Sequence, residues 1–297
     1  MSYSEAQLNT YLKHINFPLS LHPTDPLERL RLIQAHQLAR IPFESLSLHY
    51  SPHRLLSLDL QDLYDKIVTR GRGGYCMELN AFFGAILRGL GYKLINSGGR
   101  VWVKDHWTGL EHMINIVTID GQRYLVDVGF GSGGSMQPIP LIHGTEFDQI
   151  PPVRGRLEHT ALSEHGDKSQ RVWLYTTRDT SAGADAPWER RKMFLDIEFF
   201  PNDYRGMNLS PMTQPQSFFV QNVLATRVVL DEKTKRPKGV VSLLGGVVSR
   251  RGGGKEEVLV ECKTEGERVE ALDKYFEIVL SETEKGGIRG LASELKG

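Results

Sequence analysis

Cysteine is scarce in this chain of 297 residues, where only Cys76 and Cys262 occur. Two cysteines do not favour a disulfide scaffold, and a reducing compartment suits such a chain better than an oxidising one. Neither cysteine has a second one nearby and the sequence has no HExxH segment, so we expect no metal site. The first residues lack the basic-then-apolar layout of a secretion signal. We therefore expect a cytoplasmic protein.

An excess of either charge is also missing, because Lys and Arg together number 36 and Asp and Glu also number 36. Without a basic field or a basic tail, we expect neither nucleic acid nor a membrane surface as a partner. No apolar run approaches the roughly 20 residues that a membrane-spanning helix needs. The hydrophobic fraction of 40% is nevertheless enough for a sizeable core. The oligomeric state cannot be read from the sequence.

The hydrophobic pattern changes along the chain from helical to strand-like. Residues 1–95 are mostly helical in pattern, with predicted helices over 27–38 and 58–68. From Val101 onward, short β-branched runs predict an antiparallel sheet or barrel, with polar surface loops over 160–171 and 178–191. After about residue 216 we expect further strands, the first over 217–222, and a closing helix over 265–281.

Cys76 stands where a glycine-rich segment, Arg72-Gly73-Gly74-Tyr75, leads into the apolar face of a predicted helix. A thiol at a helix N-terminus lies near the positive end of the helix dipole, which favours the thiolate. The free backbone N–H groups there could also stabilise an oxyanion. Most free cysteines are simply small buried hydrophobic residues. This feature alone therefore leaves a catalytic and a structural Cys76 equally open.

Asp120-Gly121 separates two alternating apolar runs, which is typical of a β-hairpin with a two-residue turn. With this turn Ile119 pairs with Gln122, and His112 and Asp127 become diagonal neighbours on one face. The carboxylate could then orient the imidazole so that its other nitrogen serves a thiol. Either residue alone is usually structural, and a β-bulge between them would place them on opposite faces.

Taken together, these segments closely resemble the arylamine N-acetyltransferase family. The resemblance is carried by the segment from Arg72 to Cys76, by Thr108-Gly109 ahead of His112, and by the run from Val126 to Gly131. It includes residues 41–44 and continues weakly through 196–198 and 213–219, so it covers most of the chain. The Arg-Gly-Gly-x-Cys motif combined with Val-Asp-Val-Gly-Phe-Gly at this spacing is specific.

The resemblance implies an α+β fold of three domains. These are a helical N-terminal domain with a cysteine-protease-like core over residues 1–95, an antiparallel β-barrel domain over 96–215, and an α/β lid over 216–297. It also implies a catalytic triad of Cys76, His112 and Asp127. An ion pair between Arg72 and Glu44 is implied as well, holding the loop that carries the cysteine.

The activity that the resemblance implies is transfer of a short acyl group (acetyl, or alternatively malonyl or propionyl) from acyl-coenzyme A. Acyl-coenzyme A is expected as a co-substrate and not as a tightly bound cofactor. The group would form a thioester with Cys76 and then pass to the nitrogen of an arylamine, an arylhydrazine or an N-hydroxyarylamine. Substrate contacts are expected from Thr108, Gly109, Phe130, Gly131 and Phe43, although Phe43 is equally suited to a place in the core.

Three other functions remain as alternatives at this stage. A thiol hydrolase or thioesterase could use the same triad with water as the acceptor, and its product would be a free acid in place of an amide. A binding protein with a decayed site would carry no acyl adduct. A zinc hydrolase, in which Cys76, His112 and Asp127 are metal ligands, is the most distant alternative. The preferred acyl donor and the physiological amine cannot be read from the sequence.

Overall fold

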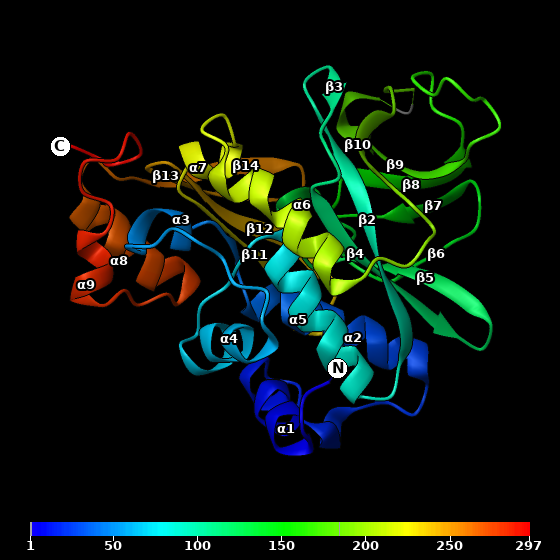
Figure 1. Ribbon diagram of the computed structural model, residues 1–297, viewed down its shortest axis with the longest axis horizontal. Coiled ribbons are helices and arrows are strands. Elements are labelled where there is room, and N and C mark those ends of the chain that lie inside the picture. The colour runs from blue at the N-terminus through cyan, green and yellow to red at the C-terminus, as the bar shows by residue number, and fades with distance from the viewer. Residues whose placement is uncertain (1, 184) are drawn as a thin grey trace.

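The structure is a computed structural model that describes residues 2–183 and 185–297. Its first part is mainly helical (Figure 1). The elements are α1 (Glu5–His14), α2 (Pro26–Arg40), the short strand β1 (Phe43–Glu44), α3 (Ser47–Tyr50), α4 (Leu60–Tyr64) and α5 (Cys76–Gly89). The expected helix over 27–38 is α2, which begins after Asp25 because the Asp25 side chain accepts a hydrogen bond from the backbone N–H of Glu28. The expected helix over 58–68 is α4 followed by a π-helical turn, Asp65–Thr69.

A nine-stranded antiparallel sheet forms the second part and curls into a nearly closed barrel (Figure 1). Its order is β6-β5-β4-β2-β10-β9-β8-β7, and β3 pairs with β2. The strands are β2 (Lys93–Val103), β3 (His106–Trp107), β4 (His112–Ile119), β5 (Gln122–Val126), β6 (Ile139–Pro140), β7 (Thr145–Asp148), β8 (Val153–Thr160), β9 (Val172–Asp179) and β10 (Glu189–Phe194). Helix α5 packs against β2 and β4, so the start of α5 lies beside the sheet.

The third part contains a second antiparallel sheet of order β1-β11-β12-β13-β14. The chain reaches it through α6 (Pro201–Thr213) and α7 (Phe218–Gln221). The sheet consists of β11 (Leu224–Leu230), β12 (Pro237–Leu244), β13 (Val247–Gly252) and β14 (Lys255–Glu261), followed by α8 (Glu265–Phe276) and α9 (Glu282–Gly286). Because β1 from the helical part is the edge strand of this sheet, the first and third parts of the chain are joined by backbone pairing.

Three local predictions differ from the structure. Residues 217–222 were expected as a strand but contain the short helix α7, because the Ser217 hydroxyl accepts a hydrogen bond from the Phe219 backbone N–H and caps it. The closing helix was expected to reach residue 281 but ends at Phe276, where Glu277 is left-handed and Ile278 N–H bonds back to Leu272.

The third difference concerns the loop expected over 178–191. Strand β9 extends into this range as far as Asp179 and β10 begins at Glu189, so only the middle is a loop. Ala184 lies outside the described residues. The end of β9 is tied to this segment by a cation–π contact, as the Arg178 guanidinium lies 4.4 Å from the ring centre of Trp188. The expected loop over 160–171 corresponds to the connection between β8 and β9.

One hydrophobic cluster includes residues from all three parts of the chain. Leu8 of α1, Phe82 of α5 and Val117 of β4 belong to it together with Val228 and Val240 of the second sheet. In the described part of the chain, no helix is both long and apolar enough to cross a membrane.

Candidate active site

Cys76 is the first residue of α5, and its placement depends on close backbone packing of the preceding loop. Gly74 accepts a hydrogen bond from the N–H of Glu44, and its own N–H donates to Pro42 O. Only glycine fits at position 73, because a Cβ there would lie 1.8 Å from Pro42 O. Cys76 is buried, and its Sγ donates to the carbonyl of Glu111 at 3.4 Å. The helix start that was predicted from the glycines is confirmed.

The hairpin also forms with the predicted register. Ile119 pairs with Gln122, and no bulge interrupts the ladder between β4 and β5. His112 opens β4 and Asp127 directly follows β5. The two side chains are buried and meet, with His112 Nε2 at 2.7 Å from Asp127 Oδ2. The imidazole also packs edge-on against the Phe130 ring, with 5.0 Å between the ring centres.

Two residues hold the start of α5 against this hairpin. A Cβ at Gly129 would lie 2.6 Å from Cys76 Cα, so the segment after Asp127 runs directly along the cysteine backbone. Asn80, one helical turn after Cys76, donates to Asp127 Oδ1 at 2.8 Å and to Met113 O at 2.7 Å. The structure therefore brings together the three residues that the sequence singled out from separate elements.

Lys192 of β10 also belongs to this site, and the sequence did not indicate it. Its ammonium group contacts Asp127 Oδ2, the same oxygen that His112 contacts. Lys192 is fully buried, and its Nζ lies 4.3 Å from the centre of the Phe130 ring. Asn80 was missed as well, although its spacing of four residues from Cys76 on one helix face is a signal that could have found it.

Burial governs the electrostatics of the site. It raises the pKa of the Cys76 thiol to about 12, and the Asp127 carboxylate acts in the same direction. Burial lowers the pKa of His112, whereas Asp127 opposes that shift and Lys192 adds to it. Burial alone would raise the pKa of Asp127, but Lys192 and His112 outweigh it and hold the value well below the ordinary range. The thiol therefore needs a neighbouring base to lose its proton, whereas Asp127 is a carboxylate throughout the neutral range.

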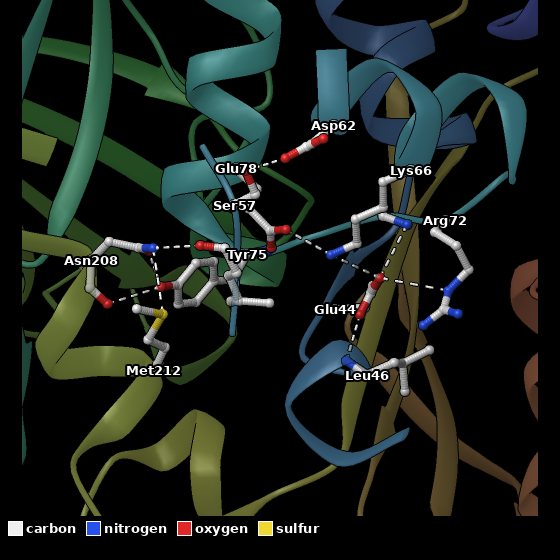
Figure 2. Close-up of polar contacts among 12 residues, drawn as sticks. Glu44, Leu46, Ser57, Asp62, Lys66, Arg72, Tyr75, Glu78, Asn208 and Met212 are labelled. Carbon is white, nitrogen blue, oxygen red and sulfur yellow. Dashed lines mark hydrogen bonds and ion pairs between the residues drawn. The ribbon is translucent and has the colours of Figure 1, made fainter. Parts of the chain in front are cut away.

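A network of buried charges supports the loop before Cys76 (Figure 2). Arg72 Nε lies 3.9 Å from Glu44 Oε1, which agrees with the expected ion pair, but the closer partner of Arg72 is Glu284 of α9. Lys66 Nζ lies 2.7 Å from Glu78 Oε1, and the other oxygen of Glu78 accepts a hydrogen bond from the N–H of Tyr75.

Two further contacts complete this support. Glu44 accepts a hydrogen bond from the N–H of Gly73 at 3.2 Å. The Tyr75 hydroxyl donates to Asn208 Oδ1, which links the residue before Cys76 to α6 (Figure 2). The loop is therefore held from the helical part, from α6 and from α9.

The five expected substrate contacts fall into two groups. Phe130 and Gly131 follow Asp127, and Phe43 lies close to them, since a Cβ at Gly131 would be 3.1 Å from the Phe43 ring. Phe43 is half-buried and packs edge-on against Phe219, so it faces both the site and the core. Thr108 and Gly109 lie on the loop that leads into β4, and Thr108 Oγ1 accepts a hydrogen bond from Val101 N–H.

The zinc alternative would require three ligands in one place. Among residues 2–183 and 185–297, no group of three His, Cys, Asp or Glu side chains is arranged to hold a metal ion.

Comparison with known proteins identifies the family to which this site belongs. Residues 26–285 match the family model described as N-acetyltransferase. The N-malonyltransferase FDB2 of Fusarium pseudograminearum (strain CS3096) is 35% identical, over 96% of this chain and 92% of that protein. Human arylamine N-acetyltransferase 2 is 30% identical, over 92% of this chain and 94% of that protein. The chain belongs to the arylamine N-acetyltransferase family. The resemblance seen in the sequence is thus confirmed.

Solved structures of arylamine N-acetyltransferases have the same fold. The enzyme of Mycobacterium marinum in complex with CoA superposes with a TM-score of 0.79 at 27% identity, covering 97% of this chain and 99% of that one. The enzyme of Nocardia farcinica gives a TM-score of 0.78 at 28% identity, covering 96% and 93%. The expected α+β fold is therefore confirmed. Members of the arylamine N-acetyltransferase family transfer an acyl group from acyl-coenzyme A to an amine, so the chain is an acyltransferase.

Proposed function

We propose that this arylamine N-acetyltransferase carries the acyl group as a thioester on Cys76, with His112 as the base and Asp127 as the residue that orients it. The observation that carries the proposal is the contact of His112 Nε2 with Asp127 at 2.7 Å, beside the helix start that bears Cys76. Nδ1 takes no part in that contact and is the nitrogen assigned to the proton of the thiol.

In the first half-reaction the thiol proton passes to His112 as the sulfur attacks the carbonyl carbon of the acyl-coenzyme A thioester. The attack gives a tetrahedral intermediate with a negatively charged oxygen. When the carbonyl re-forms, the bond to the coenzyme A sulfur breaks and His112 returns the proton to that sulfur. The negative Asp127 stabilises the imidazolium while the proton is held there. Because one thioester replaces another, the free-energy change of this half-reaction is close to zero and the half-reaction is reversible.

In the second half-reaction a neutral amine nitrogen attacks the acyl-Cys76 carbonyl. His112 takes the proton from the nitrogen, the bond to the Cys76 sulfur breaks, and the amide leaves while His112 passes the proton to the Cys76 sulfur. Arylamines, arylhydrazines and N-hydroxyarylamines suit this step because their nitrogen is unprotonated at neutral pH, whereas an alkylamine is mostly protonated. We assign Phe130 and Phe43 to the walls of the acceptor pocket, and Thr108, Gly109 and Gly131 to the path of the thioester.

The nature of the acyl group is tested by intact-mass spectrometry after incubation with acetyl-, propionyl- or malonyl-coenzyme A in the absence of amine. The expected result is one acyl group per chain, retained in Cys262→Ser and lost in Cys76→Ser. The donor that gives the most complete adduct is the preferred one. If no donor modifies Cys76, the thioester mechanism is wrong.

Adding an aromatic amine to the isolated acyl-enzyme tests the second half-reaction. The expected product is the amide, with return of the unmodified protein mass. Release of the free acid at the same rate with and without amine would instead support the thiol hydrolase alternative.

A further inference from the structure

Lys192 is a charged residue in the barrel interior, where a lysine side chain is costly to bury. Its exposed fraction is 0%, and its one ion-pair partner among the described residues is Asp127. The rest of its surroundings is aromatic, with the ring centre of Phe130 at 4.3 Å and that of Tyr175 at 5.2 Å from Nζ. Such a position requires an explanation beyond packing, because an apolar side chain of similar length would fit without the cost of desolvation.

A β-bulge directs Lys192 into the barrel. The register of β10 against β9 shifts between Arg190 and Lys192, which leaves Arg191 as an extra residue. In a regular strand, positions 190 and 192 would share one face. Here Arg190 instead stacks on the outer side over Trp102, at 4.8 Å from its ring centre. Only Lys192 is therefore turned toward Asp127.

The Asp127 carboxylate has all of its accepting positions in use. Oδ2 contacts both His112 Nε2 and the Lys192 ammonium. Oδ1 accepts hydrogen bonds from Asn80 Nδ2 and from the N–H of Gly129, each at 2.8 Å. The carboxylate is thus fixed in position, and its Oδ2 is shared between His112 and the Lys192 ammonium group.

We propose that Lys192 is a positioning residue of the triad, which holds Asp127 and limits how strongly its carboxylate stabilises protonated His112. The charged groups that act on His112 are Asp127 beyond β5 and Lys192 on β10, and the Cys76 thiol on α5 interacts with both of these groups. The carboxylate of Glu111, the residue before His112, turns away to the hydroxyl of Ser210. Lys192 thereby keeps His112 available as a neutral base for the amine proton in the second half-reaction. This inference rests on the proposed function.

The test is the pH dependence of amide formation from the isolated acyl-enzyme in Lys192→Met. The rate falls as the pH drops through the pKa of His112, because the imidazolium cannot accept a proton. This fall is the acidic limb of the pH–rate profile. Without Lys192, Asp127 stabilises the imidazolium more strongly, so the acidic limb is expected to move to higher pH by about one unit or more. A purely structural role would lower the rate at every pH and leave the limb in place.

Two matched variants separate charge from shape. Lys192→Arg keeps the charge and is expected to keep the limb at its wild-type position. Arg191→Met removes a charge from the neighbouring residue, whose side chain contacts Thr177 and Glu189, and is also expected to leave the limb unchanged. Lys192→Gln serves as a second neutral variant. A failure of both neutral variants to fold would overturn the proposal, because stability alone would then explain the lysine.

Titration of the His112 ring by NMR gives a readout that does not depend on turnover. The expected result is a higher pKa in Lys192→Met than in the wild type, and an equal value would overturn the inference. If wild-type Cys76 accepts no acyl group, the proposed function fails, but this comparison still decides the role of Lys192.

Discussion

At the residue scale, the geometry around Cys76 depends on the absence of a side chain at position 129. A Cβ at Gly129 would lie 2.6 Å from Cys76 Cα and 2.9 Å from Cys76 O. These are backbone atoms at the start of α5, so they cannot swing aside as a flexible side chain would. The segment after Asp127 and the helix start can approach each other this closely only because residue 129 is glycine.

We therefore predict that Gly129→Ala lowers the stability of the protein by about 1–3 kcal/mol and abolishes most acylation of Cys76. The measurements are the free energy of unfolding in urea and the rate of acyl-adduct formation by mass spectrometry. Gly206→Ala is the matched control, because nothing lies within 4 Å of a Cβ at that position of α6. Equal behaviour of the two variants would refute the role assigned to Gly129.

The sequence singled out Cys76, His112 and Asp127 as candidate site residues. It could do so because a glycine-rich segment before a helix and an Asp-Gly turn are patterns of a few neighbouring residues. It did not identify Lys192, because a lysine beside two arginines on a strand is ordinarily solvated. The β-bulge that turns it inward depends on pairing with β9 and leaves no mark in the sequence.

At the scale of elements, the loop before Cys76 is held by Arg72, whose side chain is buried between β1 and α9. Its guanidinium group contacts Glu284 and lies 3.9 Å from Glu44. The resemblance predicted the contact with Glu44 but not the contact with Glu284. Glu284 is 212 residues away in the chain, and local patterns carry no information about such a pairing.

We predict that Arg72→Met lowers the stability by about 3–5 kcal/mol, because the buried Glu44 loses a compensating cation. Arg70→Met is the control, since Arg70 is exposed on the same loop. Thermal unfolding followed by circular dichroism measures both. A melting temperature of Arg72→Met equal to that of Arg70→Met would show that the ion pairs do not support the loop.

The contact between Glu284 and Arg72 also has a pH dependence. Partial burial opposes ionisation of Glu284, but the Ser281 N–H and Arg72 outweigh it and lower its pKa. A carboxyl whose pKa is lower in the folded state stabilises the fold above its unfolded pKa of about 4.3, and the stabilisation is lost as the pH falls below that value.

We predict that Glu284→Gln is less stable than the wild type at pH 7 and that this difference shrinks as the pH is lowered toward 3. Urea unfolding at several pH values measures the difference. Glu282→Gln provides the comparison, because the Glu282 side chain is 88% exposed and should give little difference at any pH. A stability difference for Glu284→Gln that is constant with pH would contradict the assignment.

At the scale of the whole molecule, the three predicted domains contribute side chains to one shared hydrophobic cluster. Leu8, Val117 and Val228 come from the three segments and belong to the same hydrophobic cluster. The two sheets are also joined to the helices, through α5 against β4 and through β1 on the edge of the second sheet (Figure 1). The division at 1–95, 96–215 and 216–297 remains a prediction.

We predict that the protein unfolds in a single cooperative transition, because residues of all three segments build one shared hydrophobic cluster. The four tryptophans lie within the barrel segment, whereas Cys262 is a buried thiol of the last segment. Tryptophan fluorescence and the exposure of Cys262 to a thiol reagent should therefore change at the same urea concentration. Two separate transitions would show that the segments fold independently.

The sequence by itself determined those features that depend on neighbouring residues. The Asp120-Gly121 turn set the register that places His112 beside Asp127, and the glycines before Cys76 allowed a helix to begin at the thiol. The tertiary structure alone decided what surrounds the proposed triad and the loop before it, namely Lys192 on Asp127 and Glu284 on Arg72. These contacts join segments distant in the chain, and burial makes their charges matter, so neither could be read from a local pattern.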